Sequence, residues 1–383
     1  MIRSLKLENY RGFSKYELHD LGRVNLIVGT NNAGKTSILE AVHILESTGE
    51  FAPIWSTLTR RGEDYEDSES NRNTGQIDIR RLFHGHIVTL GSRMALSADT
   101  DQGLDQLTAS IIEATPALSK SQSLFDEGFD SEVDVDFSPK SAALSVRWKY
   151  GPLAAGGDFG FDYNLTHRGG LPYSVVRNDR GFGIERPPIR FITASALSPD
   201  TVIDLFEAVV LTPLEDIVLE ALRIIEPSIE RIATSRIDRR RTTVSSRNLG
   251  IRGGLIVRCK GIDDRIPIGS MGDGIWRILG LALTLARMEG GILLVDEIDT
   301  GLHYSVMENM WKLVTQTAKK HKIQVFATTH SRDCYESLAS VCRDSVSEQS
   351  EVTIQRIERG KSRSTAYNEQ EIIAAAQRGM EVR

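Results

Sequence analysis

The sequence predicts an α/β protein with three parts: a core on a parallel sheet, an antiparallel β lobe and a helical subdomain. Two patterns predict the core. A short apolar strand at 25–28 runs into a glycine-rich loop and then into helical apolar spacing as far as residue 45. Aliphatic residues at 292–295, an amphipathic segment at 304–320 and an apolar run at 322–331 form a strand–helix–strand unit, which is typical of parallel sheets.

The antiparallel lobe is predicted from segments in which polar and apolar residues alternate. Residues 2–8 and 16–28 alternate in this way ahead of the glycine loop. Residues 103–125 predict instead a small helix and a polar loop. Further β-like segments stand at 76–97, 141–149, 159–165 and 188–193.

The helical subdomain is predicted from Pro199 to Arg236, where apolar residues such as Leu205, Phe206 and Val209 recur at helical spacing. We therefore expect three regions along the chain. They are a first lobe with the glycine loop (1–198), the helical subdomain (199–240) and a second lobe with the acidic strand end (241–383).

The loop after the first core strand has the chemistry of a phosphate site. Gly29, Gly34, Lys35 and Thr36 match the pattern G-x-x-x-x-G-K-[ST], in which backbone N–H groups surround phosphate oxygens. We expect Lys35 to reach the β- and γ-phosphates of a nucleotide and the Thr36 hydroxyl to bind Mg²⁺. The predicted nucleotide contacts in this loop are Gly29, Asn31, Asn32, Ala33, Gly34, Lys35, Thr36 and Ser37.

Further chemical groups stand at the carboxyl ends of two other predicted core strands. Asp296 and Glu297 follow the aliphatic run, and His330 follows the next strand. An acidic pair or a histidine at such a place is often only structural, but together they fit a hydrolytic site. We predict that Asp296 holds Mg²⁺, that Glu297 orients or deprotonates the attacking water, and that His330 reaches the γ-phosphate.

A second anion site is predicted upstream of the acidic strand. Ser270, Gly272 and Gly274 precede a segment with helical apolar spacing over 275–286. Free N–H groups at the positive end of that helix would bind an anion. The alternative interpretation is a flexible turn that caps a core helix.

The overall charge argues against a protein that coats nucleic acid without selectivity, because the 383-residue chain has a formal net charge of −6 at pH 7. One tract, 231–260, differs, with a single acid, Asp238. It either binds a phosphate backbone or an acidic partner protein, or forms a solvated face. Its basic residues are Arg231, Arg236, Arg239, Arg240, Arg241, Arg247, Arg252, Arg258 and Lys260.

Membrane contact and disulfide chemistry are not expected. The sequence has no apolar run that could span a bilayer and no signal-peptide apolar block, so we expect a cytoplasmic protein. Cys259, Cys334 and Cys342 stand too far apart for a metal knuckle or a redox pair, and we interpret them as ordinary thiols.

The order of these elements resembles the ABC-type P-loop ATPases, and within them the RecF, SMC and OLD (overcoming lysogenization defect) branch. The resemblance covers nearly the whole chain, most weakly in the middle. The motifs that carry it are LKLENYRGF at 5–13, GTNNAGKTS at 29–37, GSMGDG at 269–274, ILLVDEIDTGLH at 292–303 and ATTHS at 327–331, with the OLD-like RRGE at 60–63, RRLFHG at 80–85 and EQEIIAAAQRGMEVR at 369–383.

This resemblance implies an ABC-type fold and an ATPase that uses ATP and Mg²⁺. Lys35, Glu297 and His330 would be its catalytic residues, and Thr36 and Asp296 its metal ligands. The segment Ser270, Gly272, Asp273 and Gly274 would be the signature that contacts the γ-phosphate held by another subunit. Two copies would then enclose two ATP molecules, which implies a homo-oligomer of at least two chains.

The sequence also departs from the family pattern. The signature reads SMGDG in place of the usual LSGGQ, which sets Asp273 near a phosphate, and His303 stands where many relatives have the aspartate of the D-loop. Gln76 is the nearest candidate for the glutamine that couples metal to the lobes. Arg11 resembles an arginine that some RecF-like proteins place near nucleotide, and it is equally consistent with a turn arginine.

Two functions of different classes follow from the resemblance. Only 53 residues follow His330, too few for the Toprim nuclease domain that many OLD proteins carry, so we expect an ATPase without its own nuclease. The first function is a sensor or scaffold ATPase of a bacterial anti-phage system, similar to the ATPase subunits of PARIS or Septu, which controls a separate effector such as a nuclease. The second is a RecF-like repair ATPase that binds DNA through residues 231–260.

Overall fold

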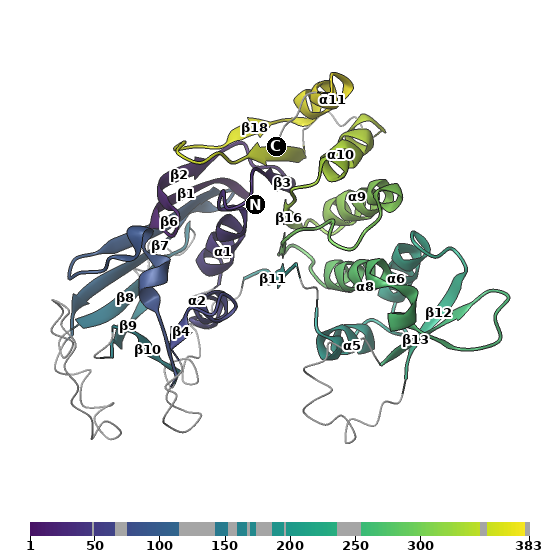
Figure 1. Cartoon of the computed structure of the whole chain (residues 1–383), viewed down its shortest axis with the longest axis horizontal. Coiled ribbons are helices and arrows are strands. Elements are labelled where there is room, and N and C mark those ends of the chain that lie inside the picture. The colour runs from purple at the N-terminus through teal and green to yellow at the C-terminus, as the bar shows by residue number, and fades with distance from the viewer. Residues whose placement is uncertain are drawn as a thin grey trace. The chain divides into compact units, whose positions relative to one another are not determined.

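The computed structural model of the chain has a mixed α/β fold that contains both a parallel-core sheet and an antiparallel sheet (Figure 1). Two compact units share the chain, and each is assembled from separate segments. The structure describes residues 1–47, 50–65, 75–114, 142–151, 159–166, 169–173, 186–194, 197–235, 254–344 and 351–379.

The first unit comprises Met1–Asp20, Glu40–Arg186 and Gly360–Ser364. Its main sheet has the strand order β2-β1-β6-β7-β8-β9, and every neighbouring pair is antiparallel. The strands are β1 (Ile2–Tyr10), β2 (Phe13–Leu18), β6 (Arg93–Thr100), β7 (Gly103–Glu113), β8 (Ala142–Lys149) and β9 (Phe159–Asn164). The antiparallel lobe that alternation predicted is therefore present.

Smaller elements complete the first unit. They are α2 (Ala52–Thr59), the short sheet of β4 (Asp64–Tyr65), β5 (Gln76–Ile77) and β10 (Leu171–Pro172), and the 3₁₀ turns η1 (Ile79–Leu82) and η2 (His84–His86). The predicted strand at 76–97 is thus divided between β5, the two turns and the start of β6.

The prediction of a helix over 103–125 is wrong, because residues 103–113 form β7. Leu104, Leu107 and Ile111 stand at helical spacing, which misled the sequence interpretation. In the structure burial alternates along the strand, and one inward position is occupied by the buried Asp105. Residues 115–125 of that prediction lie outside the described part of the chain.

The second unit comprises Leu21–Leu39, Pro187–Arg359 and Thr365–Arg383. Its main sheet has the order β11-β15-β16-β3-β17-β18, parallel except for the antiparallel edge strand β18. The strands are β3 (Val24–Val28), β11 (Ile189–Ile192), β15 (Ile292–Val295), β16 (Gln324–Thr328), β17 (Val352–Arg356) and β18 (Thr365–Tyr367). The predicted strand–helix–strand unit at 292–331 is confirmed.

Helices α8 (Asp273–Ala286), α9 (Tyr304–Lys320), α10 (Arg332–Asp344) and α11 (Glu369–Gln377) follow one another along one side of this sheet (Figure 1). Helix α1 (Lys35–Leu45) begins in this unit and ends in the first. The described residues contain no helix with both the length and the apolar character that crossing a membrane requires.

The predicted helical subdomain is partly confirmed, since α5 (Pro199–Glu207) and α6 (Leu214–Arg223) lie in it. Its last part is different: residues 229–234 form the strand β12, which pairs with β13 (Leu255–Cys259), and β13 pairs with β14 (Ile266–Pro267). The division of the chain at 198 and 240 stays a prediction.

The side chain of Asn25 fixes the central strand β3 between its neighbours. Its amide nitrogen donates to the carbonyl oxygens of Gly22 at 2.9 Å and Val325 at 3.2 Å. Its amide oxygen accepts from the Gly22 N–H and from the Thr353 hydroxyl at 2.9 Å. A fully buried amide whose partners lie on β16, on β17 and just before β3 is satisfied in one strand register only.

A buried charge cluster marks the end of α1 in the first unit. Arg186 lies 3.2 Å from the Glu46 carboxylate and 2.7 Å from that of Asp105, and its guanidinium covers the Tyr150 ring at 4.2 Å. Burial raises the pKa of Glu46 to about 7, against the favourable charge of Arg186 and with a further increase from Asp105. Two buried carboxyl groups thus share one arginine.

This cluster predicts a pH-dependent stability. Folding raises the pKa of Glu46, so the folded state holds a proton that the unfolded state releases, and stability falls as pH rises from about 4.5 to about 7. The free energy of unfolding of the native protein, relative to Glu46→Gln, should drop by about 3 kcal/mol across that window. Urea titrations at several pH values measure the difference. Glu50→Gln, at an exposed position, is the control, and an equal pH slope for native protein and Glu46→Gln would contradict the prediction.

Candidate functional site

The predicted phosphate site is assembled at the carboxyl ends of three neighbouring parallel strands in the second unit. β15, β16 and β3 lie side by side, with Val295 opposite Ala327 and Thr328 opposite Ile27. The segments that follow these strands therefore start at one edge of the sheet, which is where ligands bind in open α/β folds.

The phosphate loop has the backbone that its sequence requires. Gly29 has φ +152° and lies so close to the Ile357 carbonyl oxygen that a Cβ there would approach it to 2.5 Å. Asn32 and Gly34 also have positive φ, at +60° and +100°. Helix α1 begins at Lys35, so its positive end lies at this loop, where the helix dipole favours an anion.

Lys35 and Thr36 lie at the start of α1, beside the acidic end of β15, and their contacts with nucleotide and Mg²⁺ stay predictions. The Lys35 ammonium donates to the carbonyl oxygens of Gly29 at 2.8 Å and Thr30 at 3.1 Å, which holds it over the loop. Partial burial lowers the pKa of Lys35, opposed by the charges of Glu297 and Asp296. The Thr36 hydroxyl lies 3.1 Å from both carboxylate oxygens of Asp296.

This pair fits Mg²⁺. A hydroxyl and a carboxylate supply the hard oxygen ligands that Mg²⁺ prefers, and phosphate oxygens and water complete such sites. Across the described residues, no three His, Cys, Asp or Glu side chains converge into a metal cage. A site of this kind therefore suits an ion that arrives with a nucleotide.

Glu297 and His330 lie next to each other at this edge. The Glu297 carboxylate is 3.8 Å from the His330 Nδ1, and both side chains are about half exposed. The Thr300 hydroxyl donates to the other Glu297 oxygen at 3.3 Å. An exposed carboxylate beside an imidazole is accessible to both water and a phosphate.

Two site residues escaped the sequence interpretation. Thr328, the last residue of β16, donates its hydroxyl hydrogen to Asp296, and Arg277 of α8 donates to main-chain carbonyl oxygens around the acidic pair. Thr328 lies within the ATTHS motif at 327–331 but was not singled out there, and Arg277 belongs to none of the quoted motifs. A polar residue in an otherwise apolar strand end or helix was the available signal.

The predicted signature segment lies at the start of α8. Ser270 lies within the 3₁₀ turn η5 (Ile268–Met271). Gly272 follows this turn with φ +91° and ψ 170°, a backbone conformation that residues with a side chain rarely adopt. Asp273 occupies the first turn of α8, where the helix dipole favours a carboxylate. A Cβ on Gly274 would lie 3.0 Å from the Gly301 carbonyl oxygen, so this glycine permits close packing. Contact with a second nucleotide stays a prediction.

The remaining predicted residues have other surroundings. The Arg11 guanidinium is buried and bonded to the carboxylates of Glu63 and Glu40, so its contact with nucleotide stays a prediction. Gln76 lies in the first unit and accepts a hydrogen bond from the Thr166 hydroxyl, and its role as a metal ligand is likewise a prediction. His303 caps α9 by accepting from the Ser305 N–H.

Most of the basic tract lies outside the described residues. Of its members, only Arg231, Arg258 and Lys260 fall within them, on or beside β12 and β13. The positions outside are Arg236, Arg239, Arg240, Arg241, Arg247 and Arg252.

The geometry predicts how two variants bind nucleotide. Lys35→Ala removes a charged donor and should weaken binding of a fluorescent ATP analogue by about ten- to a hundredfold. Thr36→Val keeps the side-chain shape and should lose only the gain in affinity that Mg²⁺ provides. Lys320→Ala, an exposed lysine at the end of α9, is the control. Native affinity in Lys35→Ala would refute this position for the phosphates.

Comparison with solved structures finds similar chains of low identity. An SMC head domain from Thermotoga maritima covers 96% of this chain and 98% of its own, with 11% identity and a TM-score of 0.41. An Smc head domain with an extended coiled coil, bound to the C-terminal domain of ScpA and derived from Pyrococcus furiosus, covers 98% of each chain, with 11% identity and a TM-score of 0.44.

Comparison with curated sequences finds a relative along most of the chain and shorter matches to other proteins. A protein of Helicobacter pylori named ATP/GTP phosphatase is 22% identical over 355 residues, which is 90% of this chain and 89% of that protein. The DNA replication and repair protein RecF of Clostridioides difficile is 46% identical over 44 residues, 12% of each chain. A family model described as "AAA domain, putative AbiEii toxin, Type IV TA system" matches residues 24–333. The chain therefore belongs to this AAA family of nucleotide-binding ATP hydrolases.

Proposed function

We propose that this chain is an ATP-hydrolysing switch of a bacterial anti-phage system. It acts as an ATP-bound assembly of at least two copies and controls a separately encoded effector, which we propose to be a nuclease. The observation that carries the ATPase part is the sheet edge where Thr36 and Asp296 lie 3.1 Å apart, with Lys35 and Glu297 beside them.

The chemistry follows from the positions of these groups. Lys35 neutralises phosphate charge, and Thr36 with Asp296 holds Mg²⁺, which supplies charge stabilisation on the phosphate oxygens when bound. Glu297 accepts a proton from the attacking water, and His330, whose Nδ1 lies 3.8 Å from the Glu297 carboxylate, orients the water or the γ-phosphate. Positioning and charge stabilisation account for most catalysis of phosphoryl transfer.

A second copy completes this proposed site. The N-terminus of α8 presents Ser270, Gly272 and Asp273 at the surface, and a phosphate held by another chain fits a helix start of this kind. Asp273 places a negative charge among these residues, so we propose a weaker contact than in relatives with a neutral signature. Hydrolysis then loosens the assembly.

The proposed effector rests on two supports. The OLD-like motifs of the sequence occur here with an ATPase site, and we propose that this ATPase acts through a separate effector. The family description names a toxin of a TA system, an arrangement in which separate gene products act together. The cytoplasm is the proposed location.

The assembly has a direct test. Glu297→Gln preserves the side-chain shape but removes the proton acceptor, so the protein should accumulate ATP-bound dimers or larger assemblies. Light scattering of this variant with and without Mg·ATP, alone and with the product of the adjacent gene, measures the mass. Glu336→Gln on α10 is the control. Monomers at all ATP concentrations, with no neighbour joining them, would contradict the proposal.

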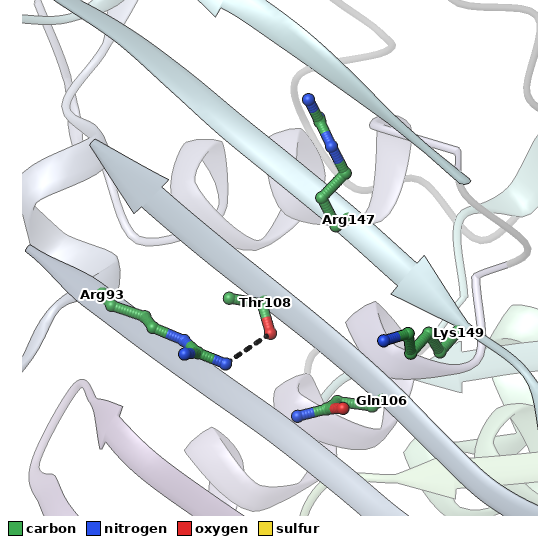
Figure 2. A pocket seen from close by; sticks show the side chains of 5 residues that line it. All are labelled: Arg93, Gln106, Thr108, Arg147 and Lys149. Atoms are coloured by element: carbon green, nitrogen blue, oxygen red, sulfur yellow. Dashed lines mark hydrogen bonds between the residues drawn. The ribbon is translucent and has the colours of Figure 1, made fainter. Parts of the chain in front are cut away.

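A second candidate function, binding of DNA, is favoured by a basic pocket on the antiparallel sheet. The pocket has a volume of about 160 Å³. Figure 2 shows the side chains on strands β6, β7 and β8 that line it: Arg93, Gln106, Thr108, Arg147 and Lys149. Like charges gathered on one sheet face destabilise it, so an anion is a suitable ligand. In this proposal the phosphate backbone occupies the pocket.

Two of the basic side chains of the pocket have partners within the protein. Arg93 donates to Thr108 at 3.4 Å (Figure 2), and Arg147 is paired with Asp162 at 2.7 Å. The slot that Arg147 occupies depends on Gly160, since a Cβ there would lie 2.5 Å from the Arg147 Cδ. Three of the five side chains that line the pocket are basic.

Salt dependence tests this second function. Replacing Arg93 and Lys149 by Gln should lower the slope of log K against log[salt] for duplex DNA by roughly 1.8, because each cation releases about 0.9 counterion. Fluorescence anisotropy measures the affinity. Lys6→Gln with Lys15→Gln, on β1 and β2, is the matched control. No binding at low salt would exclude this candidate.

A further inference from the structure

The backbone of Glu297 is in an unusual conformation. Its φ is +47°, in the left-handed region, where a residue with a side chain is less stable by about 1 to 2 kcal/mol. Strand β15 ends two residues earlier, at Val295, so the ladder of the sheet does not impose this conformation. Other contacts must hold it.

Arg277 supplies one set of these contacts. The guanidinium donates to the carbonyl oxygens of Asp296 at 2.8 Å and Glu297 at 2.9 Å through one nitrogen, and to that of Thr193 at 2.6 Å through another. The arginine is almost fully buried on α8, with 5% of its surface exposed. A planar guanidinium with fixed donor directions fixes the orientation of both peptide groups.

Thr328 supplies the second set from the neighbouring strand. Its hydroxyl oxygen accepts from the Glu297 N–H at 2.8 Å, and its hydrogen is donated to the Asp296 carboxylate at 2.7 Å. The Thr328 carbonyl oxygen also accepts from the Ile298 N–H at 3.0 Å. The N–H and the carbonyl oxygen of Glu297 are therefore both bonded to fully or almost fully buried residues.

Capping of strand ends alone does not account for this arrangement. Neutral donors would be enough to bond the free carbonyl oxygens at the strand ends. The protein instead buries the charged guanidinium of Arg277, and burial of a charge is costly unless the charge is paired. The Asp296, Glu297 and Asp299 carboxylates stabilise it electrostatically, against the burial that lowers the pKa of Arg277. The cation thus lies next to the groups that perform the proposed chemistry.

We propose that Arg277 and Thr328 are positioning residues for ATP hydrolysis, which hold Glu297 in its left-handed conformation and so aim its carboxylate at the attacking water. Arg277 lies about one helical turn from Gly272, so the same contacts connect the start of α8 to Glu297. In this proposal, a displacement of α8 on binding of a second nucleotide would move Arg277 and, through its hydrogen bond to the Glu297 carbonyl oxygen, shift the Glu297 carboxylate. The inference rests on the proposed role of Glu297.

The test separates positioning from stability. Arg277→Lys retains the charge but cannot donate to three carbonyl oxygens in the same geometry, so kcat should fall by about ten- to a hundredfold with KM and nucleotide affinity within about twofold. Thr328→Val should lower kcat similarly, and Thr328→Ser, which keeps the hydroxyl, should restore it. If Arg277→Lys does not fold, the comparison of Thr328→Val with Thr328→Ser tests the positioning role.

Thr284→Val is the matched control on the same helix, because its buried hydroxyl donates to the Gly280 carbonyl oxygen away from the site. It should lower Tm and leave kcat unchanged. Native kcat in folded Arg277→Lys and Thr328→Val, or an equal loss of kcat in Thr284→Val, would overturn the inference.

A background of Glu297→Gln distinguishes the two proposals. If Glu297 is catalytic and Arg277 acts through it, adding Arg277→Lys to Glu297→Gln lowers the residual rate no further. If Glu297→Gln hydrolyses ATP at the native rate, the proposed role of Glu297 fails. If Glu297→Gln is inactive while Arg277→Lys is fully active, only the positioning role fails.

Discussion

The register of three parallel strands is the constraint on which the site depends. Val295 pairs with Ala327 and Thr328 with Ile27, so the residues after β15 and β3 and at the end of β16 emerge at one level. A slip by one residue would move a strand about 3.3 Å and turn its side chains to the opposite face. Thr36 and Asp296 would then no longer be 3.1 Å apart. The buried Asn25 amide fixes the register of β3 by bonding its neighbours β16 and β17.

Charge and backbone strain are concentrated at the same edge. Lys35 is a partly buried cation, and the charges of Glu297 and Asp296 stabilise its protonated form. Arg277 is a mostly buried cation that the charges of Asp296, Asp299 and Glu297 stabilise. The left-handed backbone of Glu297 is stable only because buried donors and acceptors hold both sides of it. A strained backbone of this kind persists only where surrounding contacts hold it. In the proposed mechanism, it orients the Glu297 side chain before ATP binds. The core of apolar side chains around α8 makes that surrounding structure rigid.

The sequence predicted what is carried by local patterns. The phosphate loop, the aliphatic strand before Asp296 and the helix at 304–320 have spacing that fixes their structure almost without reference to the rest of the chain. β7 was missed because the buried Asp105 occupies an inward position, where Arg186 and the Gly151 N–H, both distant in the sequence, stabilise its carboxylate. Arg277 and Thr328 were missed because they bond backbone groups far away in the sequence, and such contacts leave no periodic pattern. Tertiary contacts of this type are visible only in the folded chain.

The central claim is that Glu297 at this sheet edge is the proton acceptor for hydrolysis of ATP. Rapid-quench measurement of phosphate formed in the first turnover, at saturating Mg·ATP, tests it most directly. The account predicts that Glu297→Gln binds ATP with native affinity and forms phosphate at least about a hundredfold more slowly than the native protein. A first turnover at the native rate in Glu297→Gln would contradict it.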